Sequence, residues 1–544
     1  MKLHLLLTTF ILSCLLCLTS YVSLAQSWVW AKGEGDIGND VANSVTTDTY
    51  GNTYITGNIA GKADFSGTIY QGNGIYEMYI AKYDPAGNLL WVKLAGGADN
   101  DQGNCIRWNK GFLYVCGGFS DTAFFESTAL ISKGESDAFV AKYDDSGNLL
   151  WVKPASGTGL DYATSLDIDN GGNIFVAGTY ESAITLGTTN LTTTSFYGES
   201  FYAKYDGGGN VVWAKSTSGN NPNLITGIAL DYHDALYLTG YFGGSFKVST
   251  GTVNTSSASY DIFLAKVEQS DGSLDWMKRA GSTYEDGAHG VCCDKDGYPS
   301  IIGYFAGTAY FDNNSVTYSD YNDVFVARYD PSGNNLWVRS GTGNKLDVGF
   351  AIACDETGNL FATGMFQNII YFNGNVLTTP DILDRDVFLI SYDKNGNIRW
   401  LTKAGGEDTD CGLSVAVNNN GTISISGYYL HTCFFGNLQI DYASGNDLFV
   451  AKYDPPIVNA VDEVNDDLNV SVYPNPTNAN AELRMRNAEL NPLVIRICNS
   501  LGQEVYRDTL IAKCLLSTAN WPPGIYFAEI SSAGKTKMLK LIKQ

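Results

Sequence analysis

The chain has 544 residues, with 34 basic and 57 acidic side chains, and therefore a formal net charge of −23. This acidic balance argues against a nucleic-acid partner, because binding to phosphates requires a basic surface. Apolar residues make up 44% of the chain, which excludes a disordered protein. Glycine is abundant, at 59 residues, but follows no three-residue period, so a collagen-like fibre is also excluded.

Residues 1–25 have the pattern of a secretory signal peptide. Lys2 gives a basic start, residues 3–18 form the apolar segment, and Ser23-Leu24-Ala25 is a cleavage site of small residues. A membrane anchor fits less well, because hydroxyl residues interrupt the apolar run and no second run of about 18 apolar residues follows. We therefore expect an exported protein without a transmembrane helix in the mature chain.

Removal of the signal peptide leaves nine of the 11 cysteines. An exported chain can form disulfides, but an odd number without regular spacing is not a disulfide framework. Cys105 with Cys116, and Cys498 with Cys514, lie close enough in the sequence to bridge. Free, buried thiols are the favoured interpretation, and the pairing stays open.

One unit of about 60 residues is repeated through most of the chain. Tryptophans mark it at Trp30, Trp91, Trp151, Trp213, Trp276, Trp337 and Trp400, and glycines at Gly57, Gly117, Gly178, Gly240, Gly303, Gly364 and Gly427. Between these markers lie short segments rich in Val, Ile, Tyr and Phe, which favour strands. Asp, Asn and Gly separate them and favour turns. Each repeat is therefore predicted to form a four-stranded antiparallel sheet.

A lone four-stranded sheet cannot bury both faces, whereas seven arranged radially can, so we expect an all-β, seven-bladed β-propeller over residues 26–455. The chain enters with a tryptophan strand at 28–32 that lacks three partner strands. It leaves the repeats at 448–454, after three strands that lack a tryptophan strand. One plus three strands would complete the last blade and remove an exposed edge.

The repeat signatures lie at Gly87 to Lys93, which reads GNLLWVK, and at Phe139 to Asp144, which reads FVAKYD. They resemble the bacterial β-propeller repeat family abbreviated SBBP, over about residues 27–455. The fourth blade departs most, because Val267-Glu268 replaces Tyr-Asp. The resemblance implies a propeller and extracellular display, and no single activity.

After the repeats, residues 456–466 form an acidic linker and residues 467–544 a second domain. Alternating apolar residues predict a small β-sandwich in this tail. The residues expected in its core are Val494, Ile497, Val505, Tyr506, Ile525, Phe527 and Ile530.

The tail carries Tyr473-Pro474-Asn475-Pro476 near its start and Pro522-Pro523-Gly524 before its last strands. In this order they resemble the type A C-terminal sorting domain of type IX secretion cargo. The resemblance implies that the type IX machinery is a partner. It also implies an extracellular or outer-surface location in a Gram-negative bacterium. Whether the protein stays anchored or is released after tail cleavage is open.

The sequence offers no catalytic constellation, because the histidines are scattered and neither a Gly-x-Ser-x-Gly elbow nor a phosphate-binding loop is present. Arg107 and Asp167 break the repeat symmetry at equivalent inner-strand positions of neighbouring blades, and Trp108 follows Arg107. We expect them to meet beside the central channel, as a salt bridge or as contacts to a ligand.

Acidic loops at Asp99 and Asp101, and at Glu407, Asp408 and Asp410, share one face of the expected propeller. Calcium prefers such carboxylates, so Ca²⁺ is the one candidate cofactor; solvated loops are the alternative.

Two further repeat features have structural interpretations. The run Asp294-x-Asp296-Gly297 looks like an incomplete calcium loop, for which an Asx turn is the alternative. A basic residue recurs at one position in six blades, Arg328 among them, and predicts structural ion pairs. The tryptophans of the repeats are expected to pack in the core rather than to serve as sugar platforms.

These patterns favour a secreted or surface-bound, non-enzymatic binding or adhesion protein with a glycan or protein ligand. A propeller enzyme acting on extracellular polysaccharide is an alternative, and would need two carboxylates or another base converging in the channel. A structural component of the surface layer or of motility is the third interpretation.

Overall fold

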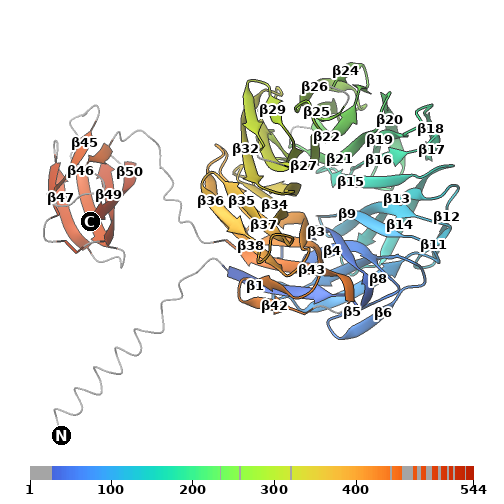
Figure 1. Cartoon of the computed structure of the whole chain (residues 1–544), viewed down its shortest axis with the longest axis horizontal. Coiled ribbons are helices and arrows are strands. Elements are labelled where there is room, and N and C mark those ends of the chain that lie inside the picture. Colours follow the sequence, from blue (N-terminus) through green and yellow to red (C-terminus); the bar gives the residue numbers. More distant parts are fainter. Residues whose placement is uncertain are drawn as a thin grey trace, which may run out of the picture. The chain divides into compact units, whose positions relative to one another are not determined.

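The computed structural model describes residues 27–544 except 233–234, 256–258, 319–320, 442–443, 456–469, 474–479, 486–492, 500–503, 511–513, 519–520, 523, 533–534 and 544. The predicted signal peptide and acidic linker lie outside the described residues. The chain divides into two compact units, Met1–Pro455 and Pro456–Gln544. All elements of the described residues are β-strands (Figure 1), which confirms the all-β prediction. No helix in this part of the chain is long and apolar enough to cross a membrane.

The first unit repeats one set of four antiparallel strands. First strands are β3 (Val41–Thr47), β9 (Gln102–Asn109), β15 (Tyr162–Ile168), β21 (Asn223–Leu230), β27 (Gly287–Cys293), β33 (Val348–Cys354) and β39 (Cys411–Val417). Second strands are β4 (Thr53–Ile59), β10 (Phe112–Phe119), β16 (Ile174–Tyr180), β22 (Ala235–Gly243), β28 (Pro299–Phe305), β34 (Leu360–Gln367) and β40 (Ile423–Tyr429). Third strands are β7 (Glu77–Tyr83), β13 (Asp137–Asp144), β19 (Glu199–Tyr205), β25 (Tyr260–Glu268), β31 (Asp323–Tyr329), β37 (Arg385–Tyr392) and β43 (Ser444–Asp454). Fourth strands are β8 (Leu89–Ala95), β14 (Leu149–Gly157), β20 (Val211–Gly219), β26 (Leu274–Ala280), β32 (Asn335–Gly343), β38 (Ile398–Gly406) and β1 (Ser27–Glu34).

The sheets follow one another in chain order around the first unit (Figure 1). Each first strand contacts the first strand of the next set, from β3 to β39, and β39 contacts β3. The N-terminal strand β1 pairs with β43, with Ser27 opposite Asp454 and Glu34 opposite Leu448. A strand near residue 30 and a strand near residue 450 therefore belong to one sheet.

The recurring glycines allow a close approach of two strands. Each first strand contains a bulge near its start, for example between Ala42 and Ser44. The bulge brings a backbone carbonyl against the glycine of the second strand, so that a β-carbon added to Gly57 would lie 1.9 Å from Val41 O. Only glycine fits at such a position. The glycines therefore lie inside the second strands, which run on beyond them.

A short hairpin between the second and third strands of each set was not predicted from the sequence. The hairpins are β5 (Lys62–Phe65) with β6 (Thr68–Gln71), β11 (Thr122–Phe125) with β12 (Thr128–Ile131), β17 (Ala183–Leu186) with β18 (Thr189–Thr192), β23 (Ser245–Val248) with β24 (Gly251–Asn254), β29 (Thr308–Phe311) with β30 (Asn314–Thr317), β35 (Ile369–Phe372) with β36 (Asn375–Thr378), and β41 (Cys433–Phe435) with β42 (Leu438–Ile440). Each lies against the fourth strand of the preceding set, as where Ala155 is opposite Leu186. The short strand β2 (Ile37–Asn39) pairs in parallel with β43.

Tryptophans of the fourth strands join neighbouring sheets. The indole N–H of Trp30 donates to Pro85 O at 3.1 Å, and that of Trp337 to Lys394 O at 3.1 Å, in each case in a turn of the next set. These tryptophans are buried or partly buried in the hydrophobic clusters. The prediction that they pack in the core is confirmed.

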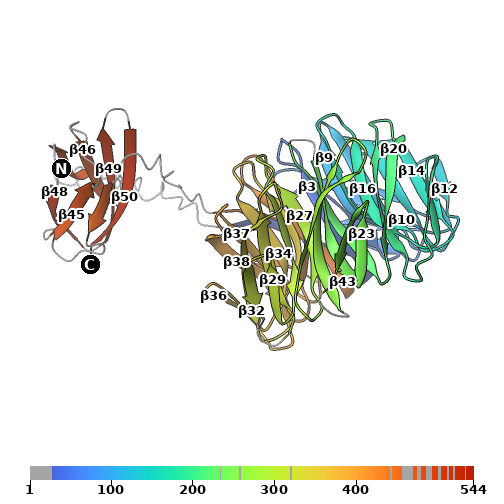
Figure 2. The same cartoon turned by 90° about the horizontal axis from the view of Figure 1, so that it is seen from above.

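Figure 2 shows the strands of the first unit side by side, with loops at both of their ends. The connections that precede first and third strands lie at one end, because neighbouring strands are antiparallel. We call this end the loop face; it includes residues 73–76, 97–101, 133–136, 158–161, 193–198, 283–286, 344–347, 379–384 and 407–410. Neighbouring loops touch there, as at the bridge between Tyr76 and Asn100.

The C-terminal unit contains two antiparallel sheets. One is formed by β44 (Val470–Tyr473), β45 (Asn480–Met485) and β48 (Cys514–Ser517), the other by β47 (Glu504–Leu510), β46 (Leu493–Asn499), β49 (Gly524–Ser532) and β50 (Lys535–Lys543). The predicted core is correct at Ile497 and Ile530, which are buried. It is wrong at Val505, which is 36% exposed, and at Val494, which is 37% exposed while Ile495 is 1% exposed. Adjacent residues of a strand point to opposite faces, so Val494 cannot share a face with Ile497.

Candidate functional site

A cavity of about 230 Å³ lies between the first strands of the first unit. Its walls are mostly apolar, with residues such as Val291 of β27 and Ile352 of β33. Arg107 of β9 and Asp167 of β15 are the two charged residues that line it. The structure therefore brings these two symmetry-breaking residues to one cavity.

Arg107 and Asp167 make separate hydrogen bonds. Arg107 Nη1 donates to Ile106 O at 3.0 Å, and Asp167 Oδ2 accepts from Leu230 N at 2.9 Å. No ion pair of the described residues joins the two side chains. Burial raises the pKa of Asp167, and the positive charge of Arg107 opposes this rise. The two groups line the cavity with opposite charges, and ligand contact there stays a prediction.

Trp108 is not one of the residues that line this cavity. Its backbone N–H donates to Thr46 Oγ1 at 3.2 Å. Its side chain packs against the hydrophobic cluster that contains Leu113 and Tyr143. The structure thus gives Trp108 a packing role.

The seven described cysteines of the first unit are free thiols, as favoured from the sequence. Cys105 and Cys116 lie opposite each other in the pairing of β9 with β10, without a disulfide. Cys292, Cys293 and Cys354 line the cavity beside Arg107. The side chains of Cys498 and Cys514 lie outside the described residues.

The acidic residues predicted to bind calcium belong to two separate loops of the loop face. In the first, Asp101 is buried and accepts the backbone N–H groups of Gly97 at 2.7 Å and Ser120 at 3.2 Å. Asp99 lies two residues before it and is half-buried. Asp101 therefore accepts backbone donors that follow β8 of the preceding sheet and β10 of its own.

In the second loop, Asp410 is also buried and accepts from Gly406 N at 2.8 Å. Asp408 pairs with His431, with 3.2 Å between Oδ2 and Nδ1, and Glu407 is exposed. Among the described residues, no group of three or more His, Cys, Asp or Glu side chains is placed to hold a metal ion. Calcium binding stays a prediction.

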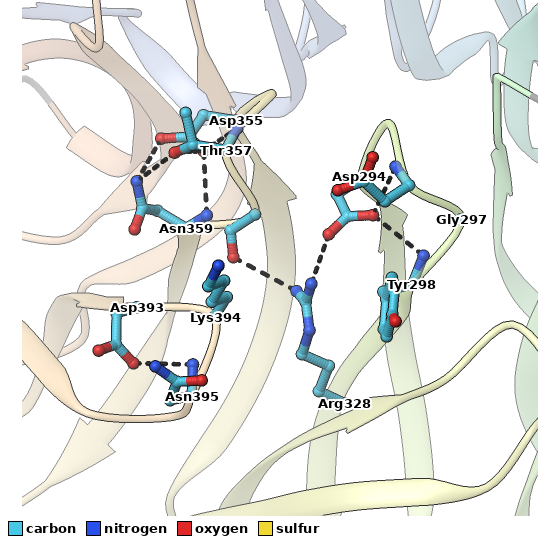
Figure 3. Close-up of polar contacts among 12 residues, drawn as sticks. Asp294, Gly297, Tyr298, Arg328, Asp355, Thr357, Asn359, Asp393, Lys394 and Asn395 are labelled. Carbon is cyan, nitrogen blue, oxygen red and sulfur yellow. Dashed lines mark hydrogen bonds and ion pairs between the residues drawn. The ribbon is translucent and has the colours of Figure 1, made fainter. Parts of the chain in front are cut away.

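The segment Asp294 to Gly297 forms a turn. The guanidinium of Arg328 binds Asp294 where a calcium loop would bind its metal ion. Asp294 Oδ1 accepts from the N–H groups of Asp296 and Tyr298, both at 3.0 Å, and Oδ2 accepts from Arg328 (Figure 3). Arg328 also donates to Gly358 O at 3.3 Å, in the turn between β33 and β34. This buried pair joins two neighbouring sheets, and the Asx-turn interpretation is correct.

Other basic residues at the same repeat position have comparable structural roles. Ion pairs join Lys82 to Asp145 at 3.0 Å and Lys266 to Asp275 at 3.4 Å. Lys452 donates to Gly51 O at 3.1 Å instead. The prediction of structural ion pairs is confirmed at Lys82, Lys266 and Arg328.

Replacing Asp294 with Ala should destabilise the first unit by about 3 kcal/mol, because removing one partner leaves Arg328 buried without its counter-charge. The midpoint of urea unfolding measures this loss. The matched control is Asp275→Ala, which breaks the more exposed pair with Lys266 and should cost about 1 kcal/mol or less. Equal losses in the two variants would contradict the prediction.

A larger pocket, of about 860 Å³, lies beside the Glu407 loop. Lys403 and the Gly405-Gly406 pair at the end of β38 form one wall, and His431 and Phe434 of the next hairpin another. Phe434 is 46% exposed and pairs with Gly405, which leaves its ring open to solvent. The volume falls in the range of small-ligand pockets, about 300–1,000 Å³.

The pocket combines an aromatic ring with groups of both charges. Lys403 Nζ lies 2.6 Å from Asp386 Oδ2, and His431 pairs with Asp408. His431 is one of the histidines that the sequence shows as scattered, and sequence reasoning does not single out Lys403 or Phe434. Strands β39 and β40 separate Lys403 from His431 and Phe434 along the sequence, so no local motif marks the pocket.

Residues 471–544 match the family described as the secretion system C-terminal sorting domain. The C-terminal unit is thus a type IX sorting domain, which implies recognition by the type IX secretion machinery and export to the cell surface or beyond. Tyr473 ends β44, and Pro522 O accepts from Tyr526 Oη at 2.7 Å. Gly524 begins β49, whereas residues 474–476 and 523 lie outside the described residues.

Two curated relatives align with most of this chain. The chain is 23% identical over 546 residues to the uncharacterized WD repeat-containing protein L264 of Acanthamoeba polyphaga mimivirus, and the alignment covers 79% of this chain and 39% of that protein. It is 25% identical over 392 residues to the regulatory protein FlaEY of Caulobacter vibrioides, covering 65% and 40%. The chain thus spans about two fifths of the length of these relatives.

Among solved structures, the WD40 β-propeller domain of Doa1 gives a TM-score of 0.40 at 10% identity, covering 79% of this chain and 97% of that one. The quinohemoprotein alcohol dehydrogenase of Comamonas testosteroni gives 0.36 at 10% identity, covering 79% and 78%. From its own strands and the match of its tail, the chain is an all-β repeat protein with a C-terminal type IX sorting domain.

Proposed function

We propose that this protein is a non-enzymatic binding protein, displayed on or released from the surface of a Gram-negative bacterium, and that its ligand is a glycan. The sorting domain supports the location. The repeat unit supports a binding role, because repeated sheets form a rigid support for variable loops and pockets.

The proposal includes the architecture predicted from the repeats. In it, the first unit is a seven-bladed propeller closed by one plus three strands, and the tail is a β-sandwich. The pairing of β1 with β43 and the contact of β39 with β3 support closure. The two antiparallel sheets of the tail support the sandwich.

The pocket between Lys403 and Phe434 is the observation that carries the binding proposal. A sugar ring presents C–H groups on its face and hydroxyls on its edge. The exposed face of Phe434 suits the first, and Lys403, Glu407 and Thr432 suit the second because they donate or accept hydrogen bonds. Leu383 is 73% exposed in the neighbouring loop, which contacts the Glu407 loop, and it extends the surface available to a longer ligand.

Phe434→Ala should lower glycan binding at least tenfold, because it removes the apolar floor of the pocket while leaving the sheets intact. The purified mature protein is screened on a glycan array, and hits are quantified by calorimetry. The matched control is Phe124→Ala, at the same position of another hairpin and 54% exposed. Binding of proteins alone, or equal binding by wild type and Phe434→Ala, would contradict the proposal.

A further inference from the structure

Two acidic side chains meet on the loop face where most neighbouring sheets of the first unit adjoin. One lies just before the first strand of a sheet, and the other at or near the start of the third strand of the preceding sheet. The pairs are Glu77 with Asp101, Asp137 with Asp161, Asp261 with Asp286, Asp323 with Asp347, Asp386 with Asp410, and Asp447 with Asp40. All of these side chains are buried.

The two carboxyl groups of a pair lie close together around a glycine. A β-carbon added to Gly281 would lie 2.8 Å from Asp261 Oδ1 and 2.9 Å from Asp286 Oδ2. At Gly35 the corresponding distances are 2.5 Å to Asp447 Oδ1 and 2.8 Å to Asp40 Oδ2. Two ionised carboxylates that flank the same glycine repel each other strongly away from water.

The pair of Asp323 and Asp347 shows what the carboxyl groups hold. Asp347 Oδ1 accepts from Gln367 N at 3.0 Å, and Asp323 Oδ1 accepts from Gly343 N at 2.9 Å. The pair thereby joins β31 and β32 of one sheet to β33 and β34 of the next. Asp347 Oδ2 is buried and has no hydrogen-bond partner among the described residues.

One sheet carries an amide where the others carry the carboxyl group before the first strand. Here Asn223 Nδ2 donates to Glu199 Oε2 at 2.9 Å, and Gly219 N donates to Glu199 Oε1 at 2.8 Å. The second bond matches the one from Gly343 to Asp323. The amide thus supplies a hydrogen-bond donor at the place where Asp347 would need a proton to supply one.

We propose that four of these carboxyl pairs, Asp137 with Asp161, Asp261 with Asp286, Asp323 with Asp347 and Asp447 with Asp40, each hold one proton at neutral pH, so that the aspartic acid before the first strand donates a hydrogen bond to the carboxylate of its partner. The proton comes from water, and no covalent bond forms or breaks. Each such pair stabilises the loop face only while it holds its proton.

The charged surroundings differ between pairs. Asp347 faces Asp323, and Asp161 faces Asp137 and Glu181. Cations reach two of the partner groups: Arg279 pairs with Asp261 at 2.5 Å, and Lys403 with Asp386 at 2.6 Å. Around the remaining pairs, Asp36 and Asp99 add negative charge beside Asp40 and Asp101, and Asp384 does so beside Asp410.

The expected pH dependence follows from these surroundings. Burial, and then the charge of Asp323, raises the pKa of Asp347 to about 9, and burial raises the pKa of Asp161 and of Asp286 to about 7. A carboxyl group whose pKa is raised on folding stabilises the fold most below its unfolded pKa of about 4. That stabilisation is lost as the pH rises through the folded pKa, so stability should fall from about pH 4 to about pH 9.

Infrared spectroscopy of the mature protein tests the proposal directly, because a protonated carboxyl group has its own carbonyl band. We expect this band at neutral pH in the wild type. It should weaken in Asp347→Asn, which replaces one acid by the amide seen at Asn223, and strengthen in Asn223→Asp. Absence of the band from the wild-type protein at neutral pH would overturn the proposal whether or not any variant folds.

Thermal unfolding at about pH 5 and about pH 8.5 gives the second readout. The fall in Tm between the two should be smaller in Asp347→Asn and larger in Asn223→Asp than in the wild type. Asp121→Asn is the control, since Asp121 is exposed and belongs to no pair. A Tm that rises with pH, or that depends on added Ca²⁺ or a chelator instead of pH, would overturn the shared proton in favour of other arrangements.

Discussion

Deletion of residues 471–544 is expected to abolish export across the outer membrane and to leave the repeat unit in the periplasm. The reason is that these residues form the sorting domain that the type IX machinery recognises. Cell fractionation and protease treatment of intact cells measure the effect. The full-length protein should be cleaved or found in the medium, whereas the truncated protein should be protected.

The truncation separates a failure of export from a failure of folding. The repeat unit ends at Pro455 and forms a compact unit of its own, so the shortened protein should keep its unfolding midpoint. Adding residues 456–544 of this protein back to the C-terminus of the truncated chain should restore export. Surface exposure of the truncated protein would show that another part of the chain directs export.

Trp337→Ala is expected to destabilise the repeat unit by about 3–5 kcal/mol, the usual cost of removing a buried tryptophan. Trp337 is 7% exposed, and its indole donates to Lys394 O at 3.1 Å in the neighbouring set. The ring also packs on Gly396, where a β-carbon would lie 2.8 Å from it. The substitution thus removes a contact between two sheets as well as a core side chain.

Urea unfolding at constant pH measures this effect. Leu336→Ala is the matched control, because Leu336 precedes Trp337 in β32 and is 46% exposed. Leu336→Ala should lower the free energy of unfolding by no more than about 0.5 kcal/mol. A loss below about 1 kcal/mol for Trp337→Ala would show that the tryptophan contacts do not join the sheets.

The sequence predicts structure best at positions where the same packing environment recurs in every repeat. Trp30 and Trp337 occupy equivalent positions of fourth strands, so the same packing selects the same residue at regular spacing. The β5–β6 hairpin and its counterparts escaped prediction because their strands are mostly four residues long, which is too short for the alternation in β5 to stand out in the sequence. The glycines were recognised, but the bulge that requires them depends on a strand partner that sequence alone does not reveal.

The candidate site was predictable only in part. Arg107 and Asp167 were found because they break a repeat, and a repeat makes an exception visible. The pocket at Lys403 and Phe434 was missed because its walls come from different strand sets. Asp101 and Asp410 look like metal ligands in the sequence, and their backbone partners become apparent only once the loop is folded.

The pairing of β1 with β43 has a consequence for the timing of folding. Ser27 and Asp454 lie opposite each other in one sheet, so that sheet cannot be completed until more than four hundred residues have been made. Contacts so distant along the chain slow folding. The two ends of the repeat unit would therefore meet late, and the sorting domain follows directly after the strand that completes this sheet.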